Sequence, residues 1–293
     1  MTIDDDRIRP AVAPGVPPLG PGEVPLSILV DYDGTIARTD VSDTINAEHI
    51  PPERFAHLEG LYETGRMGSR ELMSLEVEMF DVDPGEIVAT AAAQPHDEAF
   101  GDFARRAQAA GIPIEIVSDG FGFFIGPAMR RLGLPDIPII TALTTFEGRR
   151  ARIEYPNGHP ECFVCGTCKR NRVLAHRASG RAVLFVGDGE SDRYAAGYSD
   201  LVFAKRTLVS ICERAGWPYR PFAEFAELDE WLASALEAWR MHGTAPVTPR
   251  QVTWFCGPEV WGPGHRRPPD RGLFKQAPGG ETAPIGTDVD LEE

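Results

Sequence analysis

The sequence lacks any apolar run long enough to cross a membrane. It also has fewer basic residues than acidic ones. No window approaches the ~20 consecutive apolar residues of a membrane-spanning helix. The chain carries 29 Lys and Arg residues against 44 Asp and Glu residues, a formal net charge of −15. Nucleic acids and anionic lipids are held mainly by Lys and Arg. We therefore expect no nucleic-acid partner and no membrane partner.

Cysteine is also scarce, since the chain has five, an odd number, and three of them fall within residues 162–168. This pattern does not build a disulfide framework, and it indicates a reducing compartment. The first residues, MTIDDDRIRP, contain no apolar stretch of the kind found in secretory signals. We expect a cytoplasmic protein, with a homodimer left open.

Proline and glycine gather at the two ends of the chain. Residues 1–25 are expected to form a flexible N-terminal arm, and residues 243–293 a largely disordered C-terminal tail. Within the tail, Trp254, Phe255 and Trp261 form an aromatic group that we expect to dock on the body or on another subunit.

Between the ends, short apolar runs alternate with helical stretches. The runs predicted as strands are LSILVDY (26–32), IPIEIVSDG (112–120), PIITALTTF (138–146), AVLFVGDG (182–189) and DLVFAK (200–205). Strands that alternate with helices predict an α/β fold with a parallel sheet. In such sheets the ligand binds at the carboxyl ends of the strands.

Acidic side chains follow several of these strands. Asp31 and Asp33 come after the first strand, Ser118 and Asp119 after the second, and Asp188 after the fourth, with Asp192 four residues later. Carboxylates gathered at one edge of a sheet repel one another unless a counter-charge is present. Because Mg²⁺ prefers oxygen ligands and commonly bridges carboxylates to substrate phosphate, these strand ends predict a magnesium site.

Lys169 supplies a positive charge on a separate segment, where it would hold a phosphate and offset the carboxylates. Arg170 and Arg172 lie close by and are alternatives for that role. The Ser118 hydroxyl is also compatible with an N-cap of the helix predicted after it.

Four motifs in a fixed order resemble the haloacid-dehalogenase superfamily of phosphohydrolases. They are DYDGT (31–35), Ser118 at a strand end, Lys169, and GDGESD (187–192). The likeness spans roughly residues 27–205. It implies a Rossmann-like core formed by residues 26–40 and 106–242, with a helical cap inserted at residues 41–105.

The resemblance also implies a role for each matching residue. Asp31 is the implied nucleophile, which forms an aspartyl-phosphate, and Asp33 is the implied general acid and base. Thr35, Ser118 and Lys169 are the implied phosphate-binding residues.

The same resemblance implies the ligands of Mg²⁺. They are the Asp31 carboxylate, the Asp33 carbonyl, Asp188, and Asp192 either directly or through water. The second aspartate of the first motif favours phosphoryl transfer over dehalogenation.

Within the superfamily, the phosphoserine-phosphatase-like branch matches best. Asp40 stands where that branch carries an acidic substrate contact, and GRMGSRE (65–71) is similar to one of its cap motifs. VCGTCK (164–169) and SDLVFAK (199–205) resemble the methionine-salvage phosphatases that act on 2-hydroxy-3-keto-5-methylthiopentenyl-1-phosphate. Asp119 departs from the glycine usual in that group.

The cap supplies candidate substrate contacts. Asp40, Arg66 and Arg70 are the residues we expect to meet a polar or charged part of the substrate. The alternative for the two arginines is that both are solvated helix residues.

The cysteine-rich segment HPECFVCGTCK offers His159, Cys162, Cys165 and Cys168, a set able to bind a structural Zn²⁺. An iron–sulfur site would need a further sulfur, from Cys212 or Cys256. The segment has two other interpretations. It could provide redox control of the loop before Lys169, or it could be a compact turn with partly buried thiols.

Three functions remain in competition. The first is a Mg²⁺-dependent phosphomonoesterase acting on a small phosphorylated metabolite such as a methylthio enol or sugar phosphate. The second is a phosphoserine phosphatase, a sugar-phosphate phosphatase or a phosphotransferase of the same fold. The third is a non-catalytic binding or scaffold protein that uses the cysteine cluster and the tails. Magnesium dependence separates the third from the other two.

Overall fold

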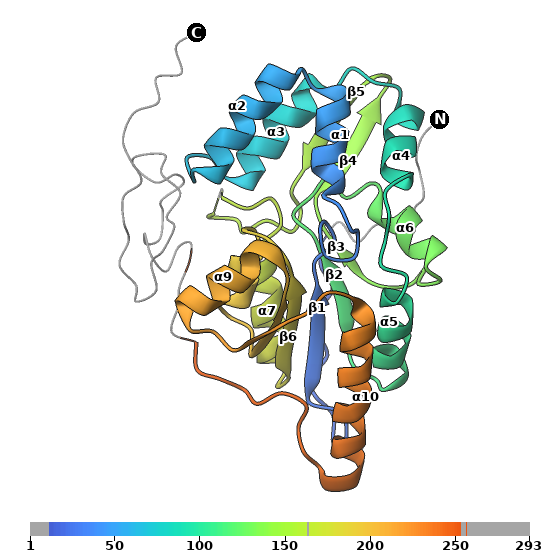
Figure 1. Ribbon diagram of the computed structural model, residues 1–293, viewed down its shortest axis with the longest axis vertical. Helices are drawn as coiled ribbons and strands as arrows, with labels where there is room; N and C mark the ends of the chain where they lie inside the picture. The colour runs from blue at the N-terminus through green and yellow to red at the C-terminus, as the bar shows by residue number, and fades with distance from the viewer. Residues whose placement is uncertain (1–11, 163, 253–255, 257–293) are drawn as a thin grey trace.

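The α/β class with a parallel sheet is confirmed by the computed structural model, which describes residues 12–162, 164–252 and 256. Six parallel strands form one sheet in the order β3-β2-β1-β6-β7-β8 (Figure 1). These strands are β1 (Leu26–Val30), β2 (Ile114–Val117), β3 (Ile139–Ile140), β6 (Ala182–Gly187), β7 (Leu201–Ala204) and β8 (Tyr219–Pro221). Every residue of β1, β2 and β6 is buried, as continuous apolar runs predict for a sheet covered on both faces.

Helices cover the two faces of the sheet with separate clusters of apolar side chains. One face packs against α5 (Phe100–Ala109), α6 (Ile125–Arg131) and α10 (Phe225–His242). The other packs against α7 (Lys169–Ala178), α8 (Arg193–Ala196) and α9 (Arg206–Ala215). The short strand β8, which carries no apolar alternation, escaped prediction.

Four further helices form a cap beyond the carboxyl ends of the strands (Figure 1). They are α1 (Val41–His49), α2 (Pro52–Glu63), α3 (Ser69–Met79) and α4 (Pro84–Ala92). The expected cap extends to residue 105, but α5 packs on β2 and α10, so it belongs with the sheet.

The expected third strand, 138–146, is two strands with different partners. Its first part is β3, in the main sheet, and its second part is β4 (Leu143–Glu147), which pairs antiparallel with β5 (Arg150–Glu154). β5 packs against α3, so this hairpin extends the cap. Solvent covers one side of β4, which explains its mixture of buried and exposed residues.

The segment from residue 12 to residue 25 is attached to the core, which corrects the expected flexible arm for that part of the chain. Arg172 donates to the Pro14 carbonyl at 2.7 Å, and Arg181 donates to the Pro17 carbonyl at 2.6 Å. Proline lacks an N–H but keeps a carbonyl acceptor, so arginine donors can fix a proline-rich segment. Residues 1–11 lie outside the described part.

The start of the C-terminal tail is also docked. Arg250 donates to the Ser199 carbonyl at 2.6 Å and to the Gly197 carbonyl at 2.8 Å, and Val247 is buried. The aromatic group Trp254, Phe255 and Trp261 lies outside the described residues. Among the described residues, no helix is long and apolar enough to cross a membrane.

Candidate active site

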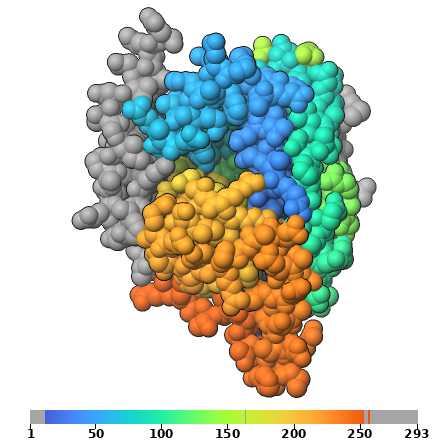
Figure 2. All heavy atoms as spheres, in the orientation of Figure 1, coloured from blue at the N-terminus to red at the C-terminus, as the bar shows by residue number. Residues whose placement is uncertain are grey.

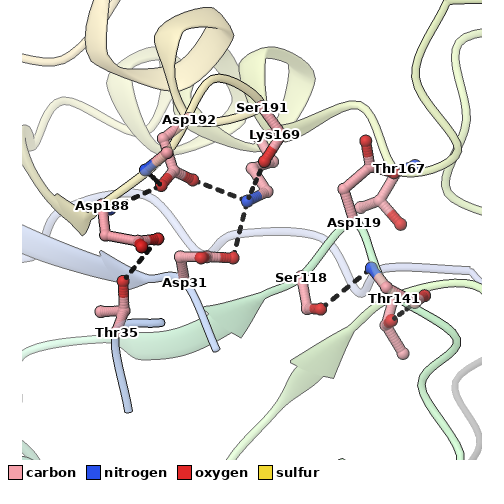
Figure 3. A network of polar contacts seen from close by, with 12 residues as sticks. Asp31, Thr35, Ser118, Asp119, Thr141, Thr167, Lys169, Asp188, Ser191 and Asp192 are labelled. Atoms are coloured by element: carbon pink, nitrogen blue, oxygen red, sulfur yellow. Dashed lines mark hydrogen bonds and ion pairs between the residues drawn. The ribbon is translucent and has the colours of Figure 1, made fainter. Parts of the chain in front are cut away.

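Neighbouring strands bring the predicted aspartates together at one edge of the sheet. Val30 pairs with Val186, and the Asp31 N–H donates to the Val186 carbonyl at 2.9 Å. One carboxylate oxygen from each of three aspartates lies within 4.8 Å of the others, namely Asp31, Asp188 and Asp192 (Figure 3). Residues more than 150 positions apart in the sequence therefore share one acidic site.

Lys169, the first residue of α7, is the cation that the sequence left in competition with its neighbours. Its Nζ donates to Oδ1 of Asp31 at 2.6 Å and to Oδ1 of Asp192 at 2.6 Å (Figure 3). The side chain is only 2% exposed. Burial alone lowers the pKa of a lysine, but these two carboxylates raise the pKa of Lys169 overall and keep it charged.

The two arginines face elsewhere. The Arg172 guanidinium forms a buried ion pair with Glu115 on β2. The Arg170 guanidinium lies over the Tyr198 ring, 5.3 Å from its centroid. Lys169 is therefore the basic residue of this segment that reaches the aspartates.

Two glycines allow the loops to approach the carboxylates. Gly34 has a φ of +69°, and a Cβ there would lie 2.1 Å from Oδ2 of Asp188. A Cβ at Gly187 would lie 2.4 Å from Oδ2 of Asp192. A side chain at either position would displace a carboxylate of the site.

Asp33 stands apart from the three clustered carboxylates. Its Oδ1 accepts a hydrogen bond of 2.8 Å from the N–H of Val41, at the start of α1. Burial raises the pKa of Asp33 well above its ordinary value, and the nearby Asp40 and Asp31 raise it further. A carboxyl group with a raised pKa is a better proton donor near neutral pH than an ordinary aspartate.

The two predicted phosphate-binding hydroxyls lie at the same edge. Thr35 Oγ1 donates to Oδ1 of Asp188 at 3.4 Å. Ser118 Oγ accepts from the N–H of Gly120 at 3.1 Å (Figure 3). The N-cap role considered for Ser118 is wrong, because the next helix is α6 and its N-cap is Phe124.

The donor set fits a magnesium ion. Burial, followed by the proximity of Asp192, raises the pKa of Asp188 to about 7, although Arg206 opposes the shift. A divalent cation would stabilise the ionised carboxylates, and oxygen donors are those that Mg²⁺ prefers. Asp192 Oδ2 accepts from the N–H groups of Asp188 and Gly189, at 2.8 and 3.0 Å, which fixes its orientation.

One site residue, Arg206, escaped sequence reasoning. Arg206 donates to Oδ2 of Asp188 at 3.2 Å and to the Arg38 carbonyl at 2.8 Å. Its φ of +43° is uncommon for a residue with a side chain. Its position directly after the SDLVFAK motif is the sequence feature that could have identified it.

Asp119, which the sequence places at the end of the second strand without assigning it a role, joins three segments. It follows β2, accepts a hydrogen bond from the Ser69 hydroxyl of the cap, and accepts the Thr167 N–H at 2.7 Å. Burial raises its pKa above the ordinary value. The available signal was its departure from the glycine usual in the resembling group.

We expect Asp119→Ala to loosen the cap, because it removes the acceptor shared by Ser69 and Thr167. Hydrogen exchange of the 164–170 backbone should become faster, and kcat/KM should fall ~10-fold as closure becomes less favourable. Mass-detected hydrogen exchange and steady-state kinetics check this. Asp102→Ala on α5, with an exposed carboxylate, is the control. Unchanged exchange in Asp119→Ala would contradict the role of Asp119 in joining the cap to this segment.

The three predicted substrate contacts have different surroundings in the structure. Asp40 is the N-cap of α1, where it accepts the Asp43 N–H at 2.9 Å. Arg70 donates to the Cys165 carbonyl at 3.1 Å and lies 5.3 Å from the centroid of the Tyr155 ring, so it joins the cap to the cysteine segment. Arg66 is exposed, as the solvated alternative expects.

The geometry of the cysteine segment does not support a zinc site. Within the described chain, the three aspartates of the site are the one set of His, Cys, Asp or Glu residues with three ligand atoms inside 4.8 Å. Cys162, Cys165 and Cys168 are free thiols, and burial raises the pKa of Cys168 to about 11. His159 Nδ1 accepts the Glu161 N–H at 3.1 Å. These contacts fit the compact turn with partly buried thiols.

A small cavity adjoins the site where cap and core meet. Its volume is about 80 Å³. It is lined by residues from α2, α3, α8 and the loops before α3 and α8, among them Tyr62, Met67, Ser69, Ser191 and Tyr194. Ser191 also accepts from Lys169 Nζ at 3.3 Å, so the cavity reaches the lysine of the site. Figure 2 shows the blue cap helices over the yellow and orange part of the core, with a recess between them.

Comparisons with known proteins agree with this architecture. A family model described as haloacid dehalogenase-like hydrolase matches residues 28–197. The chain is 29% identical to a 2-hydroxy-3-keto-5-methylthiopentenyl-1-phosphate phosphatase of Exiguobacterium sibiricum, over 71% of this chain and 96% of that protein. It is 32% identical to a phosphatase of the same name from Geobacillus kaustophilus, over 71% of this chain and 95% of that protein.

A solved structure gives the same fold. The probable phosphoserine phosphatase of Vibrio cholerae, in unliganded form, superposes with a TM-score of 0.55 at 19% identity, covering 77% of this chain and 68% of that chain. The resemblance inferred from the motifs is therefore confirmed. The chain belongs to the haloacid dehalogenase-like hydrolase family, and the relatives and fold it matches are those of the phosphatases in that family.

Proposed function

We propose that this protein is a Mg²⁺-dependent phosphomonoesterase that hydrolyses a small phosphorylated metabolite through an aspartyl-phosphate on Asp31. The observation that carries the proposal is the contact of Lys169 with both Asp31 and Asp192, beside Asp188, at the carboxyl ends of two parallel strands. A scaffold protein has no need for buried carboxylates held together in this way, so this arrangement favours catalysis.

Asp31 is positioned for nucleophilic attack. Lys169 binds Oδ1 of Asp31, which leaves Oδ2 to attack phosphorus and form the new P–O bond. The same lysine stabilises negative charge on the phosphoryl oxygens as the bond to the leaving group breaks.

Asp33 completes the reaction as a general acid and then a general base. Its raised pKa keeps a proton for the leaving alkoxide, and the resulting carboxylate can then accept a proton from the water that attacks the acyl-phosphate. Thr35 and Ser118 orient the phosphoryl oxygens. Free phosphate and restored Asp31 end the cycle.

Mg²⁺ would be held by Asp31, Asp188 and the Asp33 carbonyl, with Asp192 contributing directly or through water. When bound, the ion would neutralise charge on the phosphoryl group. The names of the relatives make a methylthio-substituted enol phosphate the first candidate substrate. Phosphoserine and sugar phosphates are second candidates. A cytoplasmic location and a homodimer stay predictions.

The test is phosphate release from a panel of small esters with and without Mg²⁺. We expect release from p-nitrophenyl phosphate and from at least one metabolite ester with Mg²⁺, and a loss of at least ~100-fold after chelation, since the metal carries charge stabilisation. Addition of Mg²⁺ should restore the rate. Turnover that is unchanged by chelation, or no turnover of any ester, would contradict the proposal.

A further inference from the structure

A serine hydroxyl beside the proposed general acid has no partner within the described part of the chain. Ser42 lies in the first turn of α1, and its Oγ is buried without a hydrogen bond to any described residue. Buried hydroxyls are nearly always hydrogen-bonded, to protein or to ordered water. The start of α1 does not need this hydroxyl, because the Asp40 carboxylate already caps the helix by accepting the Asp43 N–H. The Ser42 hydroxyl is therefore available to another molecule.

The surroundings of Gly120 show where the Ser42 hydroxyl points. A Cβ placed on Gly120 would lie 3.0 Å from Ser42 Oγ and 2.7 Å from Oδ2 of Asp33. The same Cβ would lie 3.3 Å from Ser118 Oγ. Three oxygens therefore face one point beside this glycine, and any side chain at position 120 would crowd them. Glycine leaves the point open.

The two other oxygens at this point are held by backbone N–H groups. The Val41 N–H donates to Oδ1 of Asp33 at 2.8 Å, and Oδ2 is the oxygen that faces Gly120. The Gly120 N–H donates to Ser118 Oγ at 3.1 Å, so this serine keeps its own hydrogen for a phosphoryl oxygen. Because Val41 directly precedes Ser42, the first turn of α1 orients both the general acid and the unpaired hydroxyl.

Ser42 and Asp33 form a pair that a water molecule can bridge. The two do not bond to each other directly, since Ser42 Oγ has no partner among the residues described. Two polar groups that face one point without touching are commonly joined by an ordered water. Water has two hydrogens to donate, whereas the ester oxygen of a phosphomonoester has none. As two acceptors, Ser42 and Asp33 therefore fit a water molecule better than an ester oxygen.

The second half of the proposed reaction needs a water at this place. Once the leaving alcohol has taken its proton from Asp33, the aspartate is a carboxylate and can accept one hydrogen of the water. Donation of the other hydrogen to Ser42 Oγ would fix the water and direct its lone pair at phosphorus. The water oxygen then forms a P–O bond, the bond from phosphorus to Asp31 breaks, and one water proton passes to Asp33. The products are inorganic phosphate, which keeps the other hydrogen, and the free Asp31 carboxylate.

We propose that Ser42 positions the water that hydrolyses the aspartyl-phosphate, so that it acts in the second half of the reaction and not in the first. This role rests on the phosphatase activity proposed above and adds a positioning residue to it. Asp33 serves both halves, whereas the Ser42 hydroxyl serves only the step in which water attacks.

Ser42→Ala should slow the loss of phosphate from the phosphoryl-enzyme about 10-fold, the scale of one hydrogen bond. Formation of the phosphoryl-enzyme should be nearly unchanged. Rapid mixing of enzyme, Mg²⁺ and p-nitrophenyl phosphate separates the two steps. Release of nitrophenol reports formation, and the mass of acid-quenched protein at successive times reports the loss of the phosphoryl group.

Steady-state kinetics supply a second readout that a general loosening of the fold would not give. When only the second step is slowed, kcat and KM fall together, and kcat/KM stays close to the wild-type value. The kcat of Ser42→Ala should also become similar for p-nitrophenyl phosphate and for alkyl phosphates, because every ester leaves the same phosphoryl-enzyme behind.

Two further variants serve as controls. Ser42→Thr keeps a hydroxyl at this position and should recover most of the rate of phosphate loss. Ser234→Ala is the matched control, because Ser234 is an exposed serine on α10 that donates to the Glu230 carbonyl at 3.1 Å. Both steps should keep their wild-type rates in Ser234→Ala.

The outcomes separate two failures. If the wild type forms no phosphoryl-enzyme, the proposed function fails, and Ser42 has no step to assist. If the phosphoryl-enzyme forms but Ser42→Ala loses its phosphate at the wild-type rate, only the role of Ser42 is overturned. Equal decreases in formation and in loss would overturn that role as well, because the hydroxyl would then act on the ester or on the fold.

Discussion

Asp31→Asn is expected to reduce phosphate release by about 10⁴-fold, the scale on which removal of a catalytic nucleophile acts. The amide keeps an oxygen that accepts from Lys169, so the side chain can hold its place. Its nitrogen cannot attack phosphorus, and no phosphoryl-enzyme forms. The measurement is steady-state phosphate release together with mass spectrometry of acid-quenched enzyme, in which only the wild type should carry a phosphoryl group.

The control for that variant is Asp229→Asn. Asp229 receives two hydrogen bonds from Arg106 far from the strand ends, so its loss tests whether removal of any aspartate reduces the rate. Full activity in Asp31→Asn, or a phosphoryl group that still appears on it, would move the nucleophile to another residue. Equal losses in both variants would indicate a general defect in folding.

The sequence located the acidic edge because the relevant signals are local. A buried apolar run followed by aspartates is visible without any knowledge of pairing, as at Asp31 and Asp188. Parallel strands then bring their carboxyl ends together by geometry alone. Lys169 was identified by its place in the motif order, and its competition with Arg170 and Arg172 was resolved only by the contacts of the side chains.

The parts that escaped prediction depend on contacts between distant segments. Asp119 receives its partner Ser69 from 50 residues away, and nothing near Asp119 shows that the cap will reach it. The hairpin of β4 and β5 packs on α3, so its departure from the main sheet is set by the cap. The proline-rich segment before β1 is fixed by Arg172 and Arg181, which follow it by more than 150 residues.

Lys169→Met is expected to lower kcat/KM by about 10³-fold, because it removes the charge that faces both the nucleophile and the phosphoryl group. It should also destabilise the metal-free protein by ~3–5 kcal/mol, as breaking a buried ion pair does. Methionine fills a similar volume, but Asp31 and Asp192 would lose their shared cation. Activity assays and denaturant unfolding in a chelating buffer measure the two effects.

Addition of Mg²⁺ and the variant Lys169→Arg separate the effect of the lysine's charge from the effect of its shape. Mg²⁺ should recover part of the lost stability in Lys169→Met, because it binds the same carboxylates, but it should not restore the rate. Lys169→Arg keeps the charge on a larger, planar group, so its stability should stay closer to wild type while its rate falls. If Lys169→Met were as stable as wild type without metal, the carboxylates would be protonated in the free enzyme. The lysine would then act on the bound phosphate alone, and the loss of rate would persist without any loss of stability.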